Sequence, residues 1–152
     1  MPKNQPEIIN IAKNKHVGSL HTLYEFSWSN VADKCVEATP EHIENLEHFC
    51  RDILDPIEVW WGKVTITQGI RDDEVYRVLV ALHQKMPNLF AKPSATSHHF
   101  NGNAVDFKHR KLDEIFDWVI KEGLPVRELR LYKSHLHVAQ FPFSLKRIKD
   151  CR

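Results

Sequence analysis

The chain has 152 residues, the usual size of one domain, and 42% of them are apolar, which is enough to form a core. Charged residues make up 27% and the formal net charge is +1, which argues against a nucleic-acid or membrane-surface binder driven by bulk charge. No apolar run approaches the ~20 residues that a membrane helix needs, so we expect no membrane partner. With the near-neutral charge we also expect no nucleic-acid partner, and we expect a monomer.

Composition divides the chain into a central domain and two flanking segments. Residues 1–22 are polar and mixed, and we interpret them as an N-terminal arm, extended or with a short strand. The aromatic-rich run 24–29 opens a domain that we place at 23–145, and the basic run 146–152 is interpreted as a loose tail. The N-terminus lacks the apolar core of a signal peptide, so we expect a protein that is cytoplasmic as synthesised.

Three stretches carry apolar residues at helical spacing together with start signals. The first begins at 39–41, a threonine cap followed by proline and an acidic residue, and Pro56 is expected to kink or end it. The second follows the acidic run 72–74 and stops before Pro87, and the third covers 112–120.

Short strands are predicted between these helices, with alternating or β-branched residues at 64–67, 104–107, 129–132 and 135–138. Helices interleaved with short strands indicate an α+β fold. We predict a small, largely antiparallel sheet that carries the functional site and packs with about three helices.

The cysteines and histidines limit the kinds of metal site and disulfide that the chain can form. Three cysteines without a Cys-x-x-Cys pair indicate neither a disulfide framework nor a cysteine zinc knuckle, and Cys50 is predicted to be a core residue. Ten histidines is a high count. Five of them stand in polar surroundings and are interpreted as surface residues: His16, His21, His42, His48 and His109.

The stretch 97–106 is the most informative, because it places two imidazoles and a carboxylate within ten residues. Gly102 permits a turn with positive φ before the predicted strand. Side chains alternate along a strand, so Val105 and Phe107 are expected to be buried while Asp106 faces a site.

The second histidine motif lies near the C-terminus, at 134–138. In that strand His135 and His137 share one face. If the two strands lie side by side, His99, Asp106 and His137 surround one ion. Three protein ligands of nitrogen and oxygen, plus a water, are typical of a catalytic zinc site.

The phrase Ser97-x-His99-x-x-Gly102-x-Ala104-x-Asp106, followed by a late His-x-His, resembles the M15 family of zinc peptidases. These D-Ala-D-Ala carboxypeptidases and L-Ala-D-Glu endopeptidases cut peptidoglycan stem peptides, and Hedgehog domains share their fold. The resemblance extends from about Phe26 to about Ala139. It implies one Zn²⁺ per chain, bound by His99, Asp106 and His137.

A third match is Gln68-Gly69-Ile70-Arg71, which follows a predicted strand. In the family a Gly-x-Arg turn of this kind points its arginine into the site. The resemblance implies that Arg71 pairs with a carboxylate or carbonyl oxygen of the substrate, because a guanidinium can donate two parallel hydrogen bonds. We expect Arg71 and Ser97 to bind the substrate.

The general base departs from the family pattern, which places a glutamate a few residues before the final histidine. No carboxylate occurs here between Glu128 and His137. Either Glu128 reaches the site, or His135 acts as the base or steadies the oxyanion, or the protein no longer cuts anything. Catalytic roles are therefore assigned to His135, Arg71 and Glu128 as candidates.

The resemblance implies zinc-dependent hydrolysis of peptide bonds in peptidoglycan peptides, as in phage-type lysis enzymes that reach the cell wall late. The alternative is a non-catalytic zinc-binding module of the same fold, used for cell-wall binding or structure. A metal-dependent nuclease is disfavoured because a carboxylate-rich two-metal cluster is missing from the motifs.

Overall fold

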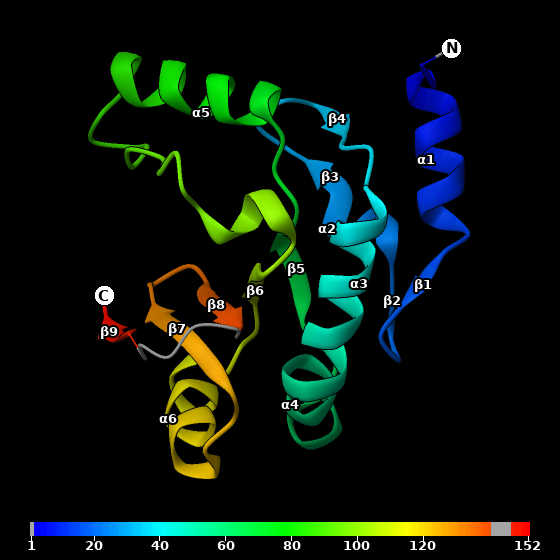
Figure 1. The fold of residues 1–152 in the computed structure, drawn as a ribbon. Coiled ribbons are helices and arrows are strands. Elements are labelled where there is room, and N and C mark those ends of the chain that lie inside the picture. The colour runs from blue at the N-terminus through cyan, green and yellow to red at the C-terminus, as the bar shows by residue number, and fades with distance from the viewer. Residues whose placement is uncertain (1, 141–146) are drawn as a thin grey trace.

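The computed structural model describes residues 2–140 and 147–152, and it confirms the predicted α+β class (Figure 1). Within that part of the chain no helix combines the length and the apolar character needed to cross a bilayer. The helices are α1 (Gln5–Lys13), α2 (Leu23–Ser27), α3 (Pro40–Phe49), the π-helix η1 (Cys50–Leu54), α4 (Asp55–Trp61), α5 (Asp73–Lys85), the 3₁₀-helix η2 (His98–Asn101) and α6 (Leu112–Glu122).

The strands form two short hairpins and one larger sheet. The hairpins pair β1 (His16–Val17) with β2 (His21–Thr22) and β3 (Trp28–Ser29) with β4 (Lys34–Cys35). The five-stranded sheet has the order β5-β6-β8-β7-β9 and consists of β5 (Thr65–Gln68), β6 (Ala104–Lys108), β8 (Leu136–Gln140), β7 (Val126–Leu131) and β9 (Arg147–Asp150).

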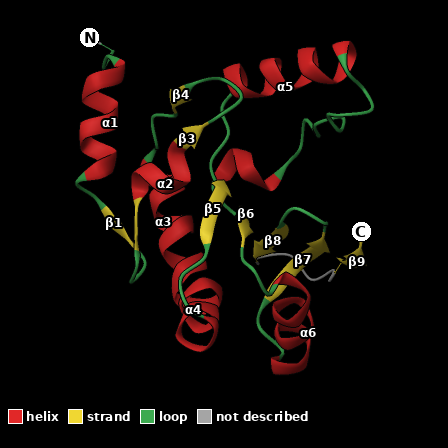
Figure 2. Ribbon diagram, turned by 180° about the vertical axis from the view of Figure 1, so that it is seen from behind, coloured by secondary structure: helices red, strands yellow, loops and turns green. Residues whose placement is uncertain are grey.

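Pairing in this sheet is antiparallel except between β7 and β9, which confirms a largely antiparallel sheet. Its apolar face joins one buried core that includes Val105, Phe107, Leu129 and Leu136. Figure 2 shows α3 and α4 stacked beside β5, with α6 below β7 and α5 above the sheet. The functional site lies on the opposite face, which carries Asp106 and His137.

The helix that begins at Thr39 does not end at Pro56. Thr39 accepts from the backbone N–H of His42 as predicted for a cap, and the helix then passes through η1 into α4 and ends at Gly62. A proline ring clashes with the carbonyl four residues earlier in a regular α-helix, and the wider π turn before Pro56 gives that carbonyl room.

The N-terminal segment forms a helix and a hairpin, so the extended arm is wrong, whereas the alternative of a short strand is met by β1 and β2. Asn4 caps α1 by accepting from the N–H of Glu7, and Ala12 and Val17 are buried in the core. The side chain of Gln5 bonds both backbone groups of Cys35. Apolar residues on one face of α1 stabilise this helix by packing against the core. The polar average composition of residues 1–22 gave no sign of that packing.

The C-terminal segment is also part of the sheet and not a loose tail. β9 pairs with β7, the N–H of Cys151 donates to the carbonyl of Leu131 (2.7 Å), and Arg152 contacts Asp113 (2.8 Å). The backbone hydrogen bonds that β9 makes at the edge of the sheet order this segment, although its basic composition suggested a tail. Residues 141–146, with the predicted end of the domain at 145, lie outside the described residues, and the domain boundaries stay predictions.

His21 is buried, so its assignment to the surface is wrong, whereas Cys50 is in the core as predicted. The Nδ1 of His21 lies 2.9 Å from Glu25, and its Nε2 lies 2.7 Å from the buried carboxylate of Glu58. Glu58 also accepts from the N–H of Val64. The cluster therefore connects the β1–β2 hairpin to α4 and to the start of the sheet.

This cluster predicts a pH-dependent contribution to stability. Burial lowers the pKa of His21, but its bonds to Glu58 and Glu25 outweigh burial and raise it above 6.5. The contribution is complete below pH 6.5 and is lost as the pH rises through the raised pKa. We expect His21→Gln to cost roughly 3 kcal/mol near pH 6, because Glu58 keeps a buried charge without its partner, and less at pH 9.

Urea unfolding of the parent and His21→Gln proteins, compared at both pH values, measures this difference. Glu25 does not obscure the comparison, because its pKa is lowered and its own contribution disappears only in acid, below pH 4.5. A pH-independent gap between the two proteins would contradict the charged cluster. His16→Gln, on the exposed side of the same hairpin, is the control.

Candidate metal centre

His99, Asp106 and His137 converge on one point at the polar face of the sheet. The Nε2 of His99 lies 3.3 Å from Asp106 Oδ1, and the Nδ1 of His137 lies 2.7 Å from the same oxygen. One ligand atom from each residue lies within 4.8 Å of the others, and His99 and Asp106 are buried. The predicted metal residues thus form a single group that could hold a metal ion.

Strand register explains how two of the three meet. Asp106 on β6 stands directly opposite His137 on β8, so their side chains project from the same face. Val105 and Val138 pair next to them and point into the core. The alternation predicted from the sequence is therefore confirmed.

The position of His99 depends on backbone contacts from the end of β5. Its Nδ1 lies 2.6 Å from the carbonyl oxygen of Gly69, to which it donates, so Nε2 keeps its lone pair toward Asp106. Gly69 must be glycine here, since an added Cβ would collide with the carbonyl of Phe26. A metal-ligating imidazole needs this kind of orientation.

Helix α3 holds the η2 turn that carries His99. His42 accepts from the N–H of Thr39 and its Nε2 donates to the carbonyl of Phe100 (2.7 Å), and Asn45 donates to the carbonyl of Asn101 (2.7 Å). His42 is thus a half-buried clamp and not the surface residue that polar surroundings suggested.

Two motif residues beside His99 shape the same turn. Gly102 has φ 79°, and an added Cβ would lie 3.0 Å from the carbonyl oxygen of His42. Ser97 accepts from the N–H of His99 (3.2 Å), so it caps the turn, and its role toward a substrate stays a prediction.

Glu128 lies on β7, behind His137. Its Oε1 is 3.9 Å from His137 Nε2 and 3.5 Å from His98 Nε2, and Arg130 donates to its Oε2 (2.8 Å). Its interaction with His137 outweighs burial and lowers the pKa of Glu128 to about 2. Burial opposes the charged form of His137, yet Asp106 and Glu128 raise its pKa to about 9.

The sequence reasoning missed this role of Glu128, although alternation along 126–131 contains the signal. Glu128 and Arg130 share a strand face, and Arg130 stands opposite His137. A carboxylate on the second nitrogen of a ligating histidine fixes the ring and increases its basicity as a ligand. The position of Glu128 therefore favours a role in orienting His137 and not a role as the general base. The sequence also gave no sign that His98 lies next to Glu128.

Arg71 is buried, with 7% of its surface exposed, and its role toward a substrate stays a prediction. Its backbone N–H donates to the carbonyl of His99 (3.0 Å), and its guanidinium lies 5.8 Å from the centre of the Phe100 ring. Among the described residues its Nε has no hydrogen-bond partner. A buried cationic donor without a partner is costly, which suits it to bind an anion or a carbonyl oxygen.

His135 stands at the open side of the group. Its Nε2 is 3.8 Å from Asp106 Oδ2, its Nδ1 is 2.8 Å from the hydroxyl of Ser134, and its ring stacks on Tyr132 at 4.6 Å. Burial lowers the pKa of His135, and the opposing effect of Asp106 is smaller. The ring is thus held within reach of whatever Asp106 binds.

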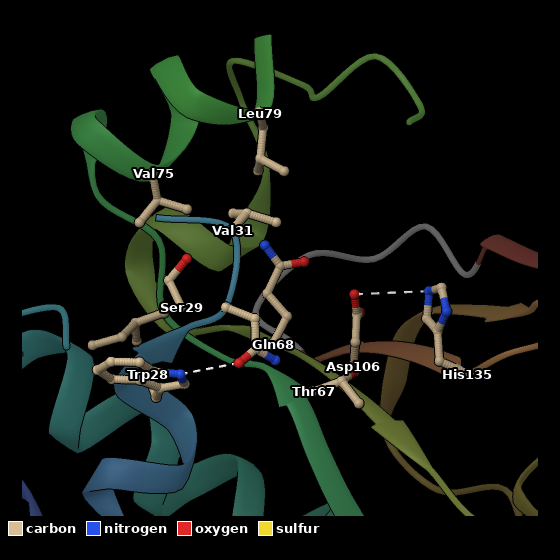
Figure 3. A pocket seen from close by; sticks show the side chains of 11 residues that line it. Trp28, Ser29, Val31, Thr67, Gln68, Val75, Leu79, Asp106 and His135 are labelled. Carbon is tan, nitrogen blue, oxygen red and sulfur yellow. Dashed lines mark hydrogen bonds and ion pairs between the residues drawn. The ribbon is translucent and has the colours of Figure 1, made fainter. Parts of the chain in front are cut away.

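A cavity of about 260 Å³ opens beside Asp106 and His135 (Figure 3). It lies between β5, helix α5 and the β3–β4 connection, and Glu128 is not among the residues that line it. Asp106 and His135 therefore face a space that can hold part of a ligand.

The donor set suits a metal such as zinc, since it offers two imidazole nitrogens, one of them with its tautomer fixed, and one carboxylate oxygen. His99, Asp106 and His137 would hold the ion, and the adjoining cavity leaves room for a further ligand. No protein-family model matches the chain, and no curated protein matches it.

Proposed function

We propose that the protein is a zinc-dependent hydrolase that cuts peptide bonds in peptidoglycan stem peptides. The observation that carries this proposal is a buried His-Asp-His group that opens onto a cavity, with Arg71 beside it. Structural zinc sites use four protein ligands, whereas three ligands and an open position suit catalysis.

Each residue around the group has a distinct task in this reaction. His99, Asp106 and His137 would hold the zinc ion, which would supply a Lewis acid for the carbonyl of the cut bond and for the attacking water, whose pKa it would lower toward ~7. His135 takes a proton from the attacking water and returns it to the leaving amine. Arg71 holds a carboxylate or carbonyl oxygen of the peptide, and Gly69 and Glu128 keep the two histidines oriented.

The substrate class follows from the motif resemblance and from Arg71. Stem peptides carry free carboxylates close to the bonds that M15 peptidases cut. Arg71, whose buried Nε has no hydrogen-bond partner among the described residues, complements such a group. A phage-type lysis enzyme acting at the cell wall is the setting that this chemistry supports.

A second candidate function is a non-catalytic zinc-binding module of the same fold. The observation in its favour is the position of Glu128, which contacts His137 and does not line the cavity. Without His135 acting as base, the site would bind metal and ligand but not cut.

Incubating the zinc-loaded protein with purified cell walls, with and without chelator, tests the proposal. Release of new amino groups that stops on chelation and returns with zinc supports the hydrolase. Stoichiometric zinc without any release from walls or soluble stem peptides would reject it in favour of the binding module.

Removing the guanidinium is expected to weaken the substrate interaction. Arg71→Ala should lower kcat/KM on stem peptides by roughly 10- to 100-fold, since a hydrogen bond to a charged group contributes about 1.5–3 kcal/mol. Zinc content should be unchanged. Arg71→Lys keeps the charge but loses the bidentate geometry and should recover only part of the rate. Unaltered kinetics of Arg71→Ala would contradict the assignment.

A further inference from the structure

We infer that the exposed face between α4 and α6 binds a basic peptide segment of a partner protein, with one long cationic side chain seated on its tryptophan rings. The inference is independent of the proposed function. Among the described residues, none lines both this cavity and the one beside Asp106. Figure 2 shows α4 and α6 at the opposite end of the molecule from α5.

Two neighbouring apolar side chains on α4 point away from the core. Val59 is 87% exposed and Trp60 is 69% exposed, although Ile57 and Glu58 on the same helix are buried. They line a cavity of about 550 Å³, whose apolar wall also includes Pro56, Trp118 and Leu124. Adjoining exposed apolar side chains with polar residues at their rim mark an interaction site, whereas single ones are ordinary.

The tryptophan rings are held in place by one another. The ring of Trp118 lies nearly parallel to that of Trp60, at 16° with 6.3 Å between the ring centres. Trp61 meets Trp118 edge-on, at 86° and 6.4 Å. Rings that are already ordered lose little freedom when a ligand binds. The face of an indole carries partial negative charge, so it attracts a cation placed over it.

The charged side chains around the rings also favour a cation. The described lining contains two carboxylates, Asp55 and Glu122, and one cation, Arg51. The Nε of Arg51 donates to Asp52 (3.2 Å), so a neighbouring carboxylate offsets its charge. Asp55 accepts from the N–H and the hydroxyl of Ser19, which are neutral donors and leave its charge in place. An ammonium or guanidinium therefore complements both the rings and the rim, whereas an anionic membrane surface would be repelled.

The apolar wall suits the stem of a lysine or arginine side chain. Such side chains lay their methylene groups along apolar surface and keep the charged head in a polar setting. At about 550 Å³ the cavity lies within the ~300–1,000 Å³ range of ligand sites, which leaves room for one such side chain and its backbone. Eight described residues line it, fewer than the ~20–30 a side of a stable interface between folded proteins. A short segment therefore fits this face better than a second copy of the chain.

Binding of a blocked trilysine peptide to the zinc-loaded, full-length chain, titrated by NMR, tests this inference. The comparison peptide is the same trilysine with each side-chain amine acetylated, which keeps the stems and removes the charge. We expect trilysine to bind roughly tenfold more tightly at low salt, because acetylation removes its attraction to the rings and to the carboxylates. Raising the salt to about 0.5 M should remove most of this preference.

Two variants identify the surface. Trp60→Leu keeps an apolar side chain but removes the ring face, and it should weaken trilysine binding by roughly 2- to 5-fold. Glu122→Gln should weaken it by up to about 5-fold and reduce its salt dependence. Both positions are exposed, so the melting temperature should stay at the parent value. Leu89→Ala, at a side chain that is 76% exposed, and Glu114→Gln, on α6 outside the lining, are the matched controls and should leave the affinity unchanged.

Equal affinity for the two peptides, or an affinity that Trp60→Leu and Glu122→Gln leave unchanged, overturns the inference. Another occupant of the same face overturns it as well. That result would be N-acetylglucosamine oligomers or anionic vesicles that bind the parent but not Trp60→Leu, or a dimer in sedimentation that Trp60→Leu dissociates. None of these measurements follows hydrolysis, so failure of this surface leaves the proposed function as it stands.

Discussion

Replacing both His99 and His137 with alanine is expected to reduce bound zinc from one ion per chain to less than about a tenth. The double variant keeps only the carboxylate of Asp106 out of three donors, and a single carboxylate does not retain zinc. Hydrolysis should disappear with the metal. Elemental analysis after dialysis, together with the amino-group assay, measures both effects.

Folding of this variant needs its own check, because His99 is buried and donates to Gly69. His99→Gln with His137→Gln keeps polar side chains of similar reach, and far-UV circular dichroism compares each pair with the parent. A double variant of the exposed His16 and His48 controls for the number of histidines removed. Full zinc content in the folded His99/His137 variant would show that the ion binds elsewhere.

The second large effect is expected at His135. His135→Ala should retain one zinc and the parent melting temperature but lose about 10²- to 10⁴-fold in kcat, the usual contribution of a general base. Its Nε2 faces Asp106 across 3.8 Å at the mouth of the cavity, and it donates nothing to the core. The loss should fall on kcat more than on KM, since the ring acts on the proton and not on the bound peptide.

Glu128→Gln provides the contrast that identifies the base. If Glu128 only supports His137, this variant should lose about 10- to 100-fold in zinc affinity yet keep the parent kcat once zinc is saturating. If instead Glu128 takes the proton, kcat falls at saturating zinc and His135→Ala remains active. The two variants therefore give opposite patterns under the two assignments, with Glu122→Gln on the exposed end of α6 as control.

The metal group could be predicted because its cause is local and periodic. Alternation along a strand allows only two faces, so Asp106 and His137 followed from neighbouring apolar residues such as Val105 and Val138. The cap at Thr39 is equally local, since a hydroxyl reaches an N–H three residues away. Such features depend on a few adjacent residues and survive in any tertiary context.

Other features depended on partners distant in sequence. His21 is buried because Glu58, 37 positions later, satisfies it, and its polar neighbours in the sequence gave no sign of this. The bulge that brings Gln68 opposite Asp106 arises from the pairing of β5 with β6 and not from a residue type. Helix α1 likewise owes its stability to packing that only the folded chain supplies.

The parallel strand at the C-terminus has a practical consequence for handling the protein. β9 covers the outer edge of β7 from Glu128 to Leu131. A truncation that removes 147–152 as a dispensable basic extension would leave that row of backbone N–H and C=O groups free to pair with another chain. Self-association through this edge would start one strand away from His137, so the shortened protein could lose activity by aggregating while all of its ligands are still present.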